Sequence, residues 1–154
     1  MIKDDIGYLA NYFWRESLNN IQAILTLDEV KYFSGNDYYY LTTIYHMNQP
    51  NLSEVAEALD MTKPAISALY RKLNKIGLLN KIQSKEDKRM FHLEVTSKGE
   101  KIVLGDERMY EYLEEIVKSS IPDQRDIKLF ETVLEQTIIT LKENMINNEK
   151  PIGK

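Results

Sequence analysis

The chain has 154 residues, of which 43% are hydrophobic and 29% charged, a composition typical of a soluble globular protein. It contains no cysteine, which excludes disulfides, thiolate zinc sites and thiol-based redox sensing within this sequence. It has no run of about 18 apolar residues and no signal-peptide pattern at the N-terminus, so we expect a cytoplasmic protein without membrane contact.

The net charge of −4 is unevenly distributed along the chain. Residues 61–92 carry a net charge of +6, whereas the remainder carries −10. Lysine-rich helix faces are often simply solvated, but a basic segment in an acidic protein is also typical of a surface that faces phosphates. Residues 61–92 are therefore the first candidate for an interface with nucleic acid.

The N-terminal part of the chain is predicted to be helical. Apolar residues recur near helical spacing over 5–27. Asn36 or Asp37 is placed to cap a second helix that ends near Met47, and the sequence Asn-Gln-Pro-Asn at 48–51 interrupts it. The expected buried residues of this second helix are Leu41, Ile44 and Tyr45.

Two short helices separated by a tight turn are predicted next. Ser53 is expected to cap the first, and Thr62 the second. Pro64 lies in the first turn of the second helix, where its missing N–H costs nothing, and Gly77 is a natural residue to end it. The apolar stripe of the second helix consists of Ile66, Leu69, Leu73 and Ile76.

A polar hairpin follows these helices. Residues 78–82 and 90–95 read as two short strands, and Phe91, Leu93 and Val95 alternate with polar residues. The connection 84–89 is wholly polar, as expected for a hairpin tip.

Two longer helices complete the chain. The first is predicted over 98–119 with Thr96 or Ser97 as its cap, and the second runs from Pro122 to about Asn147. The last helix has an apolar seam near heptad spacing. This seam could pack within one chain, but the terminal segments have more apolar surface than the middle can cover, so we predict a homodimer. The predicted interface residues are Ile127, Phe130, Leu134, Ile138, Leu141 and Met145.

Together these elements predict a mainly α fold with a small β hairpin. The architecture is a winged helix-turn-helix whose N- and C-terminal helices form a dimerisation region. We assign 1–35 and 98–148 to the helical dimerisation region, 36–97 to the winged DNA-binding domain and 149–154 to a flexible tail.

The second helix of this motif is the predicted recognition helix. Such a helix fits the major groove of DNA, and the side chains at its N-terminal end reach base edges. Lys63, Ser67 and Arg71 lie four residues apart on its polar face, and the small residues beside them allow a close approach to the groove. The predicted DNA-binding residues are Thr62, Lys63, Pro64, Ala65, Ser67, Ala68, Arg71 and Lys72, the last two as phosphate contacts.

The hairpin tip supplies further predicted DNA contacts at Lys85, Asp87, Lys88 and Arg89. A basic tip can enter the minor groove, where the negative potential attracts arginine. We expect Asp87 to orient the Arg89 guanidinium through a charge-assisted hydrogen bond. The alternative is an ordinary solvated pair of little energetic value.

The segments LSEVAEALDMTKPAISALYRKLNKIGLLNK and SKEDKRMFHLEVTSKG resemble the multiple antibiotic resistance regulator (MarR) family. The resemblance implies a triangular dimer that reads successive major grooves of a pseudo-palindrome. It also implies a repressor released by a small anionic or phenolic ligand bound between the dimerisation region and the winged domain. By match to the motif, Lys63, Pro64, Ala65 and Ser67 would read bases and Arg89 would lie in the minor groove, whereas Ala68 replaces a residue that is polar or basic in many relatives.

We therefore expect a sequence-specific regulator that binds double-stranded DNA as a homodimer, most simply a ligand-responsive repressor, although the sequence does not separate repression from activation. The alternative is a winged-helix module that binds a protein and has no operator of its own. The salt dependence of binding discriminates between these two functions.

A small aromatic or anionic effector is a further expected partner. The tyrosine run 38–40 and the group Tyr8, Tyr12 and Trp14 either line a pocket for it or belong to the core and the dimer interface. No residue is assigned to ligand binding on these patterns.

No catalytic motif is present, so we expect no enzyme activity and no cofactor. His46 and His92 have no metal-ligand spacing, so we expect no metal site.

Overall fold

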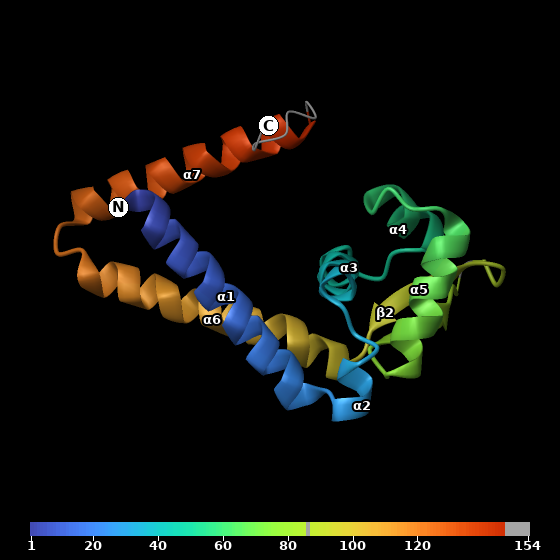
Figure 1. The fold of residues 1–154 in the computed structure, drawn as a ribbon. Coiled ribbons are helices and arrows are strands. Elements are labelled where there is room, and N and C mark those ends of the chain that lie inside the picture. Colours follow the sequence, from blue (N-terminus) through green and yellow to red (C-terminus); the bar gives the residue numbers. More distant parts are fainter. Residues whose placement is uncertain (86, 147–154) are drawn as a thin grey trace, which may run out of the picture. The chain divides into compact units, whose positions relative to one another are not determined.

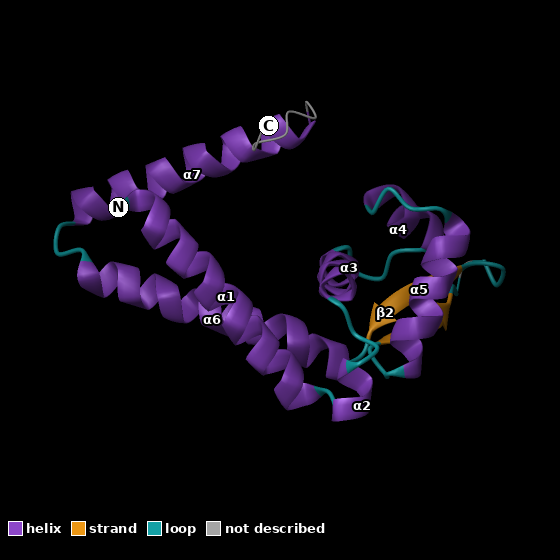
Figure 2. Ribbon diagram, viewed as in Figure 1, coloured by secondary structure: helices purple, strands orange, loops and turns teal. Residues whose placement is uncertain are grey.

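The computed structural model describes residues 1–85 and 87–146, apart from the side chains of residues 145 and 146. Helices and a single hairpin account for the described fold (Figures 1 and 2), which confirms the predicted mainly α class. The elements are α1 (Ile2–Ile24), α2 (Leu27–Val30), α3 (Gly35–His46), α4 (Leu52–Ala58), α5 (Lys63–Lys75), β1 (Leu79–Gln83), β2 (Phe91–Val95), α6 (Ser97–Ser120) and α7 (Gln124–Ile146).

The chain divides into two compact units, residues 1–110 and 111–154. The first unit holds α1 to α5, the hairpin and the first part of α6, and the second holds the rest of α6 together with α7. The division into a dimerisation region and a winged domain stays a prediction, and the predicted tail 149–154 lies outside the described residues.

The core of the first unit is formed by aliphatic side chains from the end of α1, from the segment of α3 to β2 and from α6. Full burial of such a side chain contributes about 1.5–3 kcal/mol. The predicted stripe of α5 is buried, as are Leu41 and Ile44 of α3, while Tyr45 is only half-buried. The largest fully buried residues are Leu41, Ile44, Val55, Ile66, Leu73, Leu78, Leu79, Leu93 and Ile102.

The beginning of α3 differs from the prediction. Ser34, and neither Asn36 nor Asp37, is the N-cap: its Oγ accepts a hydrogen bond from the Asp37 N–H at 3.3 Å. The Asp37 carboxylate accepts the Ser34 N–H in return at 2.7 Å, which completes a capping box. Asp37 therefore lies inside the first turn, where its charge also suits the helix dipole.

The cap of α4 is also one that the prediction missed. Asn51, and not Ser53, is the N-cap, because its Oδ1 accepts hydrogen bonds from the N–H groups of Ser53 at 2.8 Å and Glu54 at 3.0 Å. Glu54 accepts the Asn51 N–H at 2.7 Å, so the helix begins at Leu52. Similarly, a capping box at Thr26 begins helix α2, which was not predicted. Helix α1 therefore ends at Ile24, three residues earlier than predicted.

Helix α1 crosses the first part of α6 at a close approach. Asn20 donates a hydrogen bond from Nδ2 to the Ile102 carbonyl at 2.8 Å, and its side chain lies directly over Gly105. A Cβ atom at Gly105 would be 2.1 Å from the Asn20 amide. The absence of a side chain at residue 105 thus permits the crossing (Figure 1).

The hairpin is antiparallel, with Leu79 opposite Val95 and Gln83 opposite Phe91. One feature was absent from the prediction: the segment before α4 joins the sheet through a bridge between Asn51 and His92 and through the Leu93 N–H, which donates to the Pro50 carbonyl at 2.8 Å. This pairing fixes the start of the helix-turn-helix against the wing. Among the described residues, no helix is both long and apolar enough to cross a bilayer.

Candidate nucleic-acid interface

The helices α4 and α5 form a helix-turn-helix. The turn between them places Asp60 in the left-handed region at φ 49°, and the Met61 N–H donates to the Ala56 carbonyl at 2.9 Å. Thr62 caps α5 as predicted, since its Oγ1 accepts a hydrogen bond from the Ala65 N–H at 3.4 Å. The C-terminal end is Gly77 at φ 74°, a conformation that glycine adopts without strain.

Lys63, Ser67 and Arg71, four residues apart, lie on the face of α5 opposite its buried stripe. This arrangement leaves the first two turns of the helix available to a groove, which is where a recognition helix contacts bases. Ala65 and Ser67 are half-buried, and the assignments to DNA contact stay predictions. The exposed members of the predicted DNA-binding set are Thr62, Lys63, Pro64, Ala68, Arg71 and Lys72.

Lys72 differs from the other cations of α5. Its Nζ lies 2.5 Å from Oδ2 of Asp37, a carboxylate that is only 4% exposed. The same Asp37 caps α3, so Lys72 ties the recognition helix to the beginning of α3. A buried anion lowers the attraction of this lysine for phosphate, because its charge is already compensated.

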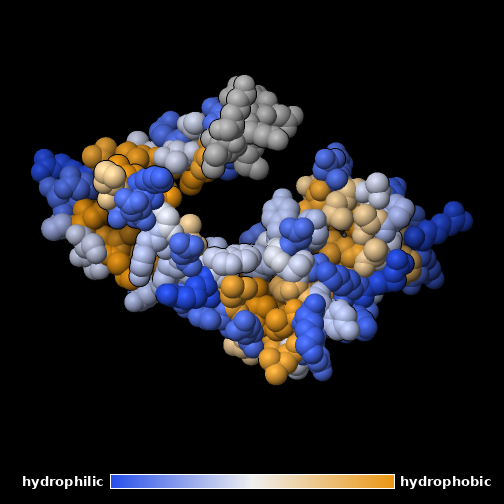
Figure 3. All heavy atoms as spheres, viewed as in Figure 1, coloured by the Kyte–Doolittle hydropathy of each residue, from blue (hydrophilic) through white to orange (hydrophobic). Residues whose placement is uncertain are grey.

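The wing carries its cations on a tight tip, which is part of the hydrophilic surface in Figure 3. Within it the Met90 N–H donates to the Asp87 carbonyl at 2.9 Å. Lys85, Asp87, Lys88 and Arg89 are all exposed. This placement is compatible with groove contact, which stays a prediction.

The expected role of Asp87 requires a correction. Its Oδ1 accepts a hydrogen bond from the main-chain N–H of Arg89 at 2.9 Å, and no ion pair joins it to the Arg89 guanidinium among the described residues. A carboxylate two residues before an N–H readily makes this turn contact, as Asx turns do. Asp87 therefore shapes the tip and does not hold the guanidinium.

A contact between the wing and the recognition helix was missed by the sequence reasoning. The Nζ of Lys81 on β1 lies 4.5 Å from the centroid of the Tyr70 ring on α5 and 6.0 Å from that of Phe91 on β2. A cation over aromatic rings is stabilised by their negative faces. No spacing rule indicates this pairing, because Tyr70 and Lys81 meet only after the chain turns at Gly77.

The remaining cations define the electrostatic surface of the candidate interface. Lys75 also lies over a ring, 5.1 Å from the centroid of Tyr32. Five further cations of this surface form no ion pair or ring contact within the described part of the chain. They are Lys63, Arg71, Lys85, Lys88 and Arg89.

The predicted dimer seam on α7 is exposed to solvent in the single chain. Figure 3 shows apolar surface along this helix. Its side chains are 41–50% exposed at Phe130, Leu134, Ile138 and Leu141, and Ile127 is half-buried. The side chain of Met145 lies outside the described residues. Such an apolar stripe on a helix is typical of a surface that another helix covers.

The aromatic residues fall into two environments. Tyr38 and Trp14 line a small apolar cavity of about 70 Å³ together with Phe33 and Gly35. The hydroxyl of Tyr38 donates to Asp106, a carboxylate 4% exposed that also accepts the Ser17 hydroxyl at 2.9 Å. Burial, and then the neighbouring Asp106 carboxylate, raise the pKa of the Tyr38 phenol. Tyr8 and Tyr39 are exposed.

The two histidines have separate surroundings. Nδ1 of His92 lies 2.9 Å from the Gln49 carbonyl, and the His46 ring packs edge-on against Tyr45. Over residues 1–85 and 87–146, no three potential metal-ligating side chains of the His, Cys, Asp or Glu type gather at one place.

A helix-turn-helix whose second helix is followed by a two-stranded wing defines the class of winged helix-turn-helix proteins. Residues 33–91 match the model of the MarR family. The HTH-type transcriptional regulator BilQ of Clostridioides difficile (strain CD3) is 36% identical over 69 residues, which are 45% of this chain and 46% of that protein. This match confirms the resemblance to the MarR family that is seen in the sequence. The aligned segment spans about half the length of this curated relative.

Solved structures share the fold over nearly the whole chain. S. aureus MepR bound to ethidium bromide has a TM-score of 0.68 at 16% identity, covering 92% of this chain and 96% of MepR. Streptococcus pneumoniae FabT in complex with DNA has a TM-score of 0.62 at 18% identity, covering 93% and 99%. A MarR-like transcriptional regulator from Thermotoga maritima has a TM-score of 0.67 at 19% identity, covering 92% and 94%. At these identities the likeness shows the fold alone.

Proposed function

We propose that this protein is a transcription regulator that binds a specific site on double-stranded DNA as a homodimer. The observation that carries the proposal is the arrangement of α5. One face is buried in the core, while the opposite face and the wing tip present exposed cations. FabT, which shares this fold, has been solved in complex with DNA, and this complex supports the same function here.

The exposed seam on α7 supports the dimer in this proposal. A dimer with two-fold symmetry binds two half-sites about 34–36 Å apart, or a multiple, because this spacing brings both recognition helices to one side of the duplex. The apolar residues of the seam would be buried by the corresponding helix of a second copy.

We further propose that the protein is a repressor that responds to a small effector. The cavity beside Tyr38 is smaller than the roughly 300–1,000 Å³ of sites for drug-sized ligands, so the side chains around it must move to admit one. The buried Asp106 carboxylate behind Tyr38 disfavours an anionic effector there and favours one with a hydrogen-bond donor or a positive charge. Of the two predicted effector types, an aromatic one suits this cavity and an anionic one does not.

The decisive experiment is selection of a binding site from a random-sequence duplex library, followed by titration of the selected site across a salt series. We expect enrichment of a pseudo-palindrome, binding that survives excess unrelated DNA, and an affinity that falls steeply as salt rises. Recovery of no preferred sequence by the folded protein, at low salt, would contradict the proposal and favour the protein-interaction module.

A further inference from the structure

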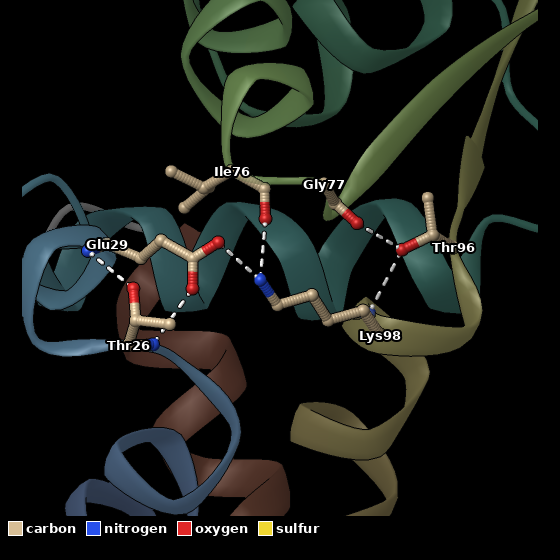
Figure 4. Close-up of polar contacts among 7 residues, drawn as sticks. Thr26, Glu29, Ile76, Gly77, Thr96 and Lys98 are labelled. Carbon is tan, nitrogen blue, oxygen red and sulfur yellow. Dashed lines mark hydrogen bonds and ion pairs between the residues drawn. The ribbon is translucent and has the colours of Figure 1, made fainter.

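The side chains of Thr96 and Lys98 bind the carbonyls at the C-terminal end of α5 (Figure 4). The ammonium of Lys98, in the first turn of α6, donates a hydrogen bond to the Ile76 carbonyl at 3.1 Å. It also forms an ion pair with Oε1 of Glu29 on α2 at 2.5 Å. Ile76 is the C-cap residue of α5, so one cation binds the end of the recognition helix and the N-terminal segment at once.

Glu29 is itself fixed in place. Its second carboxylate oxygen, Oε2, accepts the Thr26 N–H at 2.8 Å, and its own N–H donates to Thr26 Oγ1 at 3.3 Å. The Lys98 ammonium, as the strongest influence, and the Thr26 N–H lower the pKa of Glu29 to about 2. Both oxygens of the Glu29 carboxylate are therefore engaged, one by Lys98 and the other by the Thr26 N–H.

A second contact holds the adjacent carbonyl. Thr96 donates a hydrogen bond from Oγ1 to the Gly77 carbonyl at 2.6 Å, and the Thr96 N–H donates to the Leu78 carbonyl at 3.0 Å. The carbonyls at a helix C-terminus lack partners within the helix and attract cations. The beginning of α6 and the residue before it supply these missing partners for α5.

We infer that Lys98 is a positioning residue for DNA recognition, and that Glu29 is the anchor through which α2 and α6 together set the direction of α5. This inference rests on the proposed function. A helix of 13 residues is about 20 Å long, so a small displacement of its C-terminal end is carried to the base-reading end. Hydrogen bonds to bases tolerate only a few tenths of an ångström, whereas attraction to phosphates acts over a longer range.

Lys98 is distinguishable from a phosphate contact. Its charge is compensated by Glu29, and it lies at the end of α5 opposite to the predicted reading positions. Loss of Lys98 should therefore weaken binding to the selected site and leave binding to unrelated DNA nearly unchanged. Loss of a phosphate contact would instead weaken both and reduce the salt slope by about one.

The test compares Lys98→Met and Glu29→Gln with Lys101→Met. Lys101 is an exposed lysine one turn further along α6, and its side chain makes no hydrogen bond or ion pair with the described residues. Dissociation constants are measured at several salt concentrations for the selected duplex and an unrelated one. We expect the first two variants to lose about tenfold in specific affinity, equivalent to about 1.4 kcal/mol, with an unchanged salt slope. Lys101→Met should match the wild type on the selected duplex.

A double variant and a conservative variant sharpen the result. Lys98→Met combined with Glu29→Gln should lose little more than either single change, because both remove the same contact. Lys98→Arg should retain much of the specific affinity, since it keeps a cation near both acceptors. Equal losses on both duplexes, or no loss on the selected duplex, would overturn the inference.

Hydrogen exchange separates this inference from the proposed function. In the wild type the Gly77 and Leu78 N–H groups donate to Asn74 and Leu73 carbonyls, both at 2.9 Å, at the end of α5. In Lys98→Met these two amides should exchange faster, while in Lys101→Met they should not. If the wild type selects no DNA site but this difference is seen, the proposed function fails and the positioning contact stands. If these two amides exchange at the wild-type rate in Lys98→Met, the positioning role of Lys98 is contradicted as well.

Discussion

At the scale of single residues, several side chains are constrained by what lies next to them. Gly99 shows this best, because its Cα lies against the wing. A Cβ there would be 2.6 Å from Cγ1 of Val95 and 2.7 Å from the Leu78 carbonyl oxygen. The carbonyl cannot retreat easily, since it accepts the Thr96 N–H.

We therefore predict that Gly99→Ala lowers the free energy of unfolding by about 1–3 kcal/mol, as overpacking of a core does. Gly7→Ala is the matched control, since a Cβ at Gly7 in α1 meets nothing within 4 Å. There the change should be neutral or stabilising by about 0.5–1 kcal/mol, because alanine favours helix more than glycine. Urea unfolding of both variants measures the difference, and equal stabilities would contradict the steric argument.

The ion pair of Glu29 gives a prediction about pH. Its pKa is about 2 in the folded chain against an ordinary value of 4.5, so its contribution is complete above about pH 4.5 and is lost as the pH falls towards 2. Glutamine can keep the capping box but not the charge. Glu29→Gln should therefore be less stable than the wild type at pH 6, with the two converging near pH 2. A difference that persists unchanged at pH 2 would argue against the ion pair.

Arg89 is the wing residue with the sharpest predicted effect on recognition. The Asp87 carboxylate accepts the main-chain N–H of Arg89, and the Arg89 guanidinium has no ion-pair partner among the described residues. Arg89→Ala should cost about 1–3 kcal/mol of affinity for the selected duplex. Lys85→Ala, at an exposed lysine of the same tip, should weaken the selected and unrelated duplexes alike. Unchanged operator binding by Arg89→Ala, measured by titration, would rule out the wing assignment.

At the scale of elements, the sequence predicted the existence and order of most helices and of the hairpin. Burial on one side produces a spacing of three and four residues in a helix and an alternation in a strand. The first pattern holds for Ile66, Leu69 and Leu73 and the second for Leu93 and Val95, and all five are buried. A periodic pattern is local, so it can be read without knowledge of the fold.

Helix beginnings are harder to predict. Ser53 and Asn51 are both residue types that cap helices, and the choice between them depends on which carbonyl and amide groups come together. The reciprocal bond from Glu54 to Asn51 decides the matter in the structure. The capping-box spacing from Asn51 to Glu54 is visible in the sequence and indicates the true cap, although asparagine is not the usual first residue of that pattern.

The contacts of the candidate interface that the sequence missed are all between distant residues. Lys72 with Asp37, and Lys98 with Glu29, are 35 and 69 residues apart. The net charge of residues 61–92 counts Lys72 as available for DNA, whereas the structure pairs it with the carboxylate of Asp37. Which surface cations are available is therefore a property of tertiary structure.

At the scale of the whole molecule, the exposed apolar seam of α7 indicates that a second chain covers this helix. Leu134 is 50% exposed in the single chain and lies in the middle of the seam. Leu134→Glu should convert the dimer to a monomer, because a carboxylate at an apolar helix interface loses its hydration without compensation. Specific binding should fall with it, since a monomer contacts one half-site only.

Light scattering with size-exclusion chromatography measures the oligomeric state. Gln136→Glu is the control, because it adds the same charge to the same helix at an exposed polar residue. A Leu134→Glu variant that is folded and monomeric yet binds the full site tightly would contradict the dimer model. A variant that remains dimeric would place the interface elsewhere.

The separation of a basic segment from an acidic remainder also affects how two dimers bind next to each other on one duplex. The remainder of each chain carries a net charge of −10, so a dimer would carry −20 outside its two basic segments. Dimers bound at adjacent sites then repel one another over about a Debye length, roughly 8 Å at physiological salt. The protein should occupy isolated sites and not spread into a continuous coat, and a duplex with two sites side by side should fill with negative cooperativity that added salt abolishes.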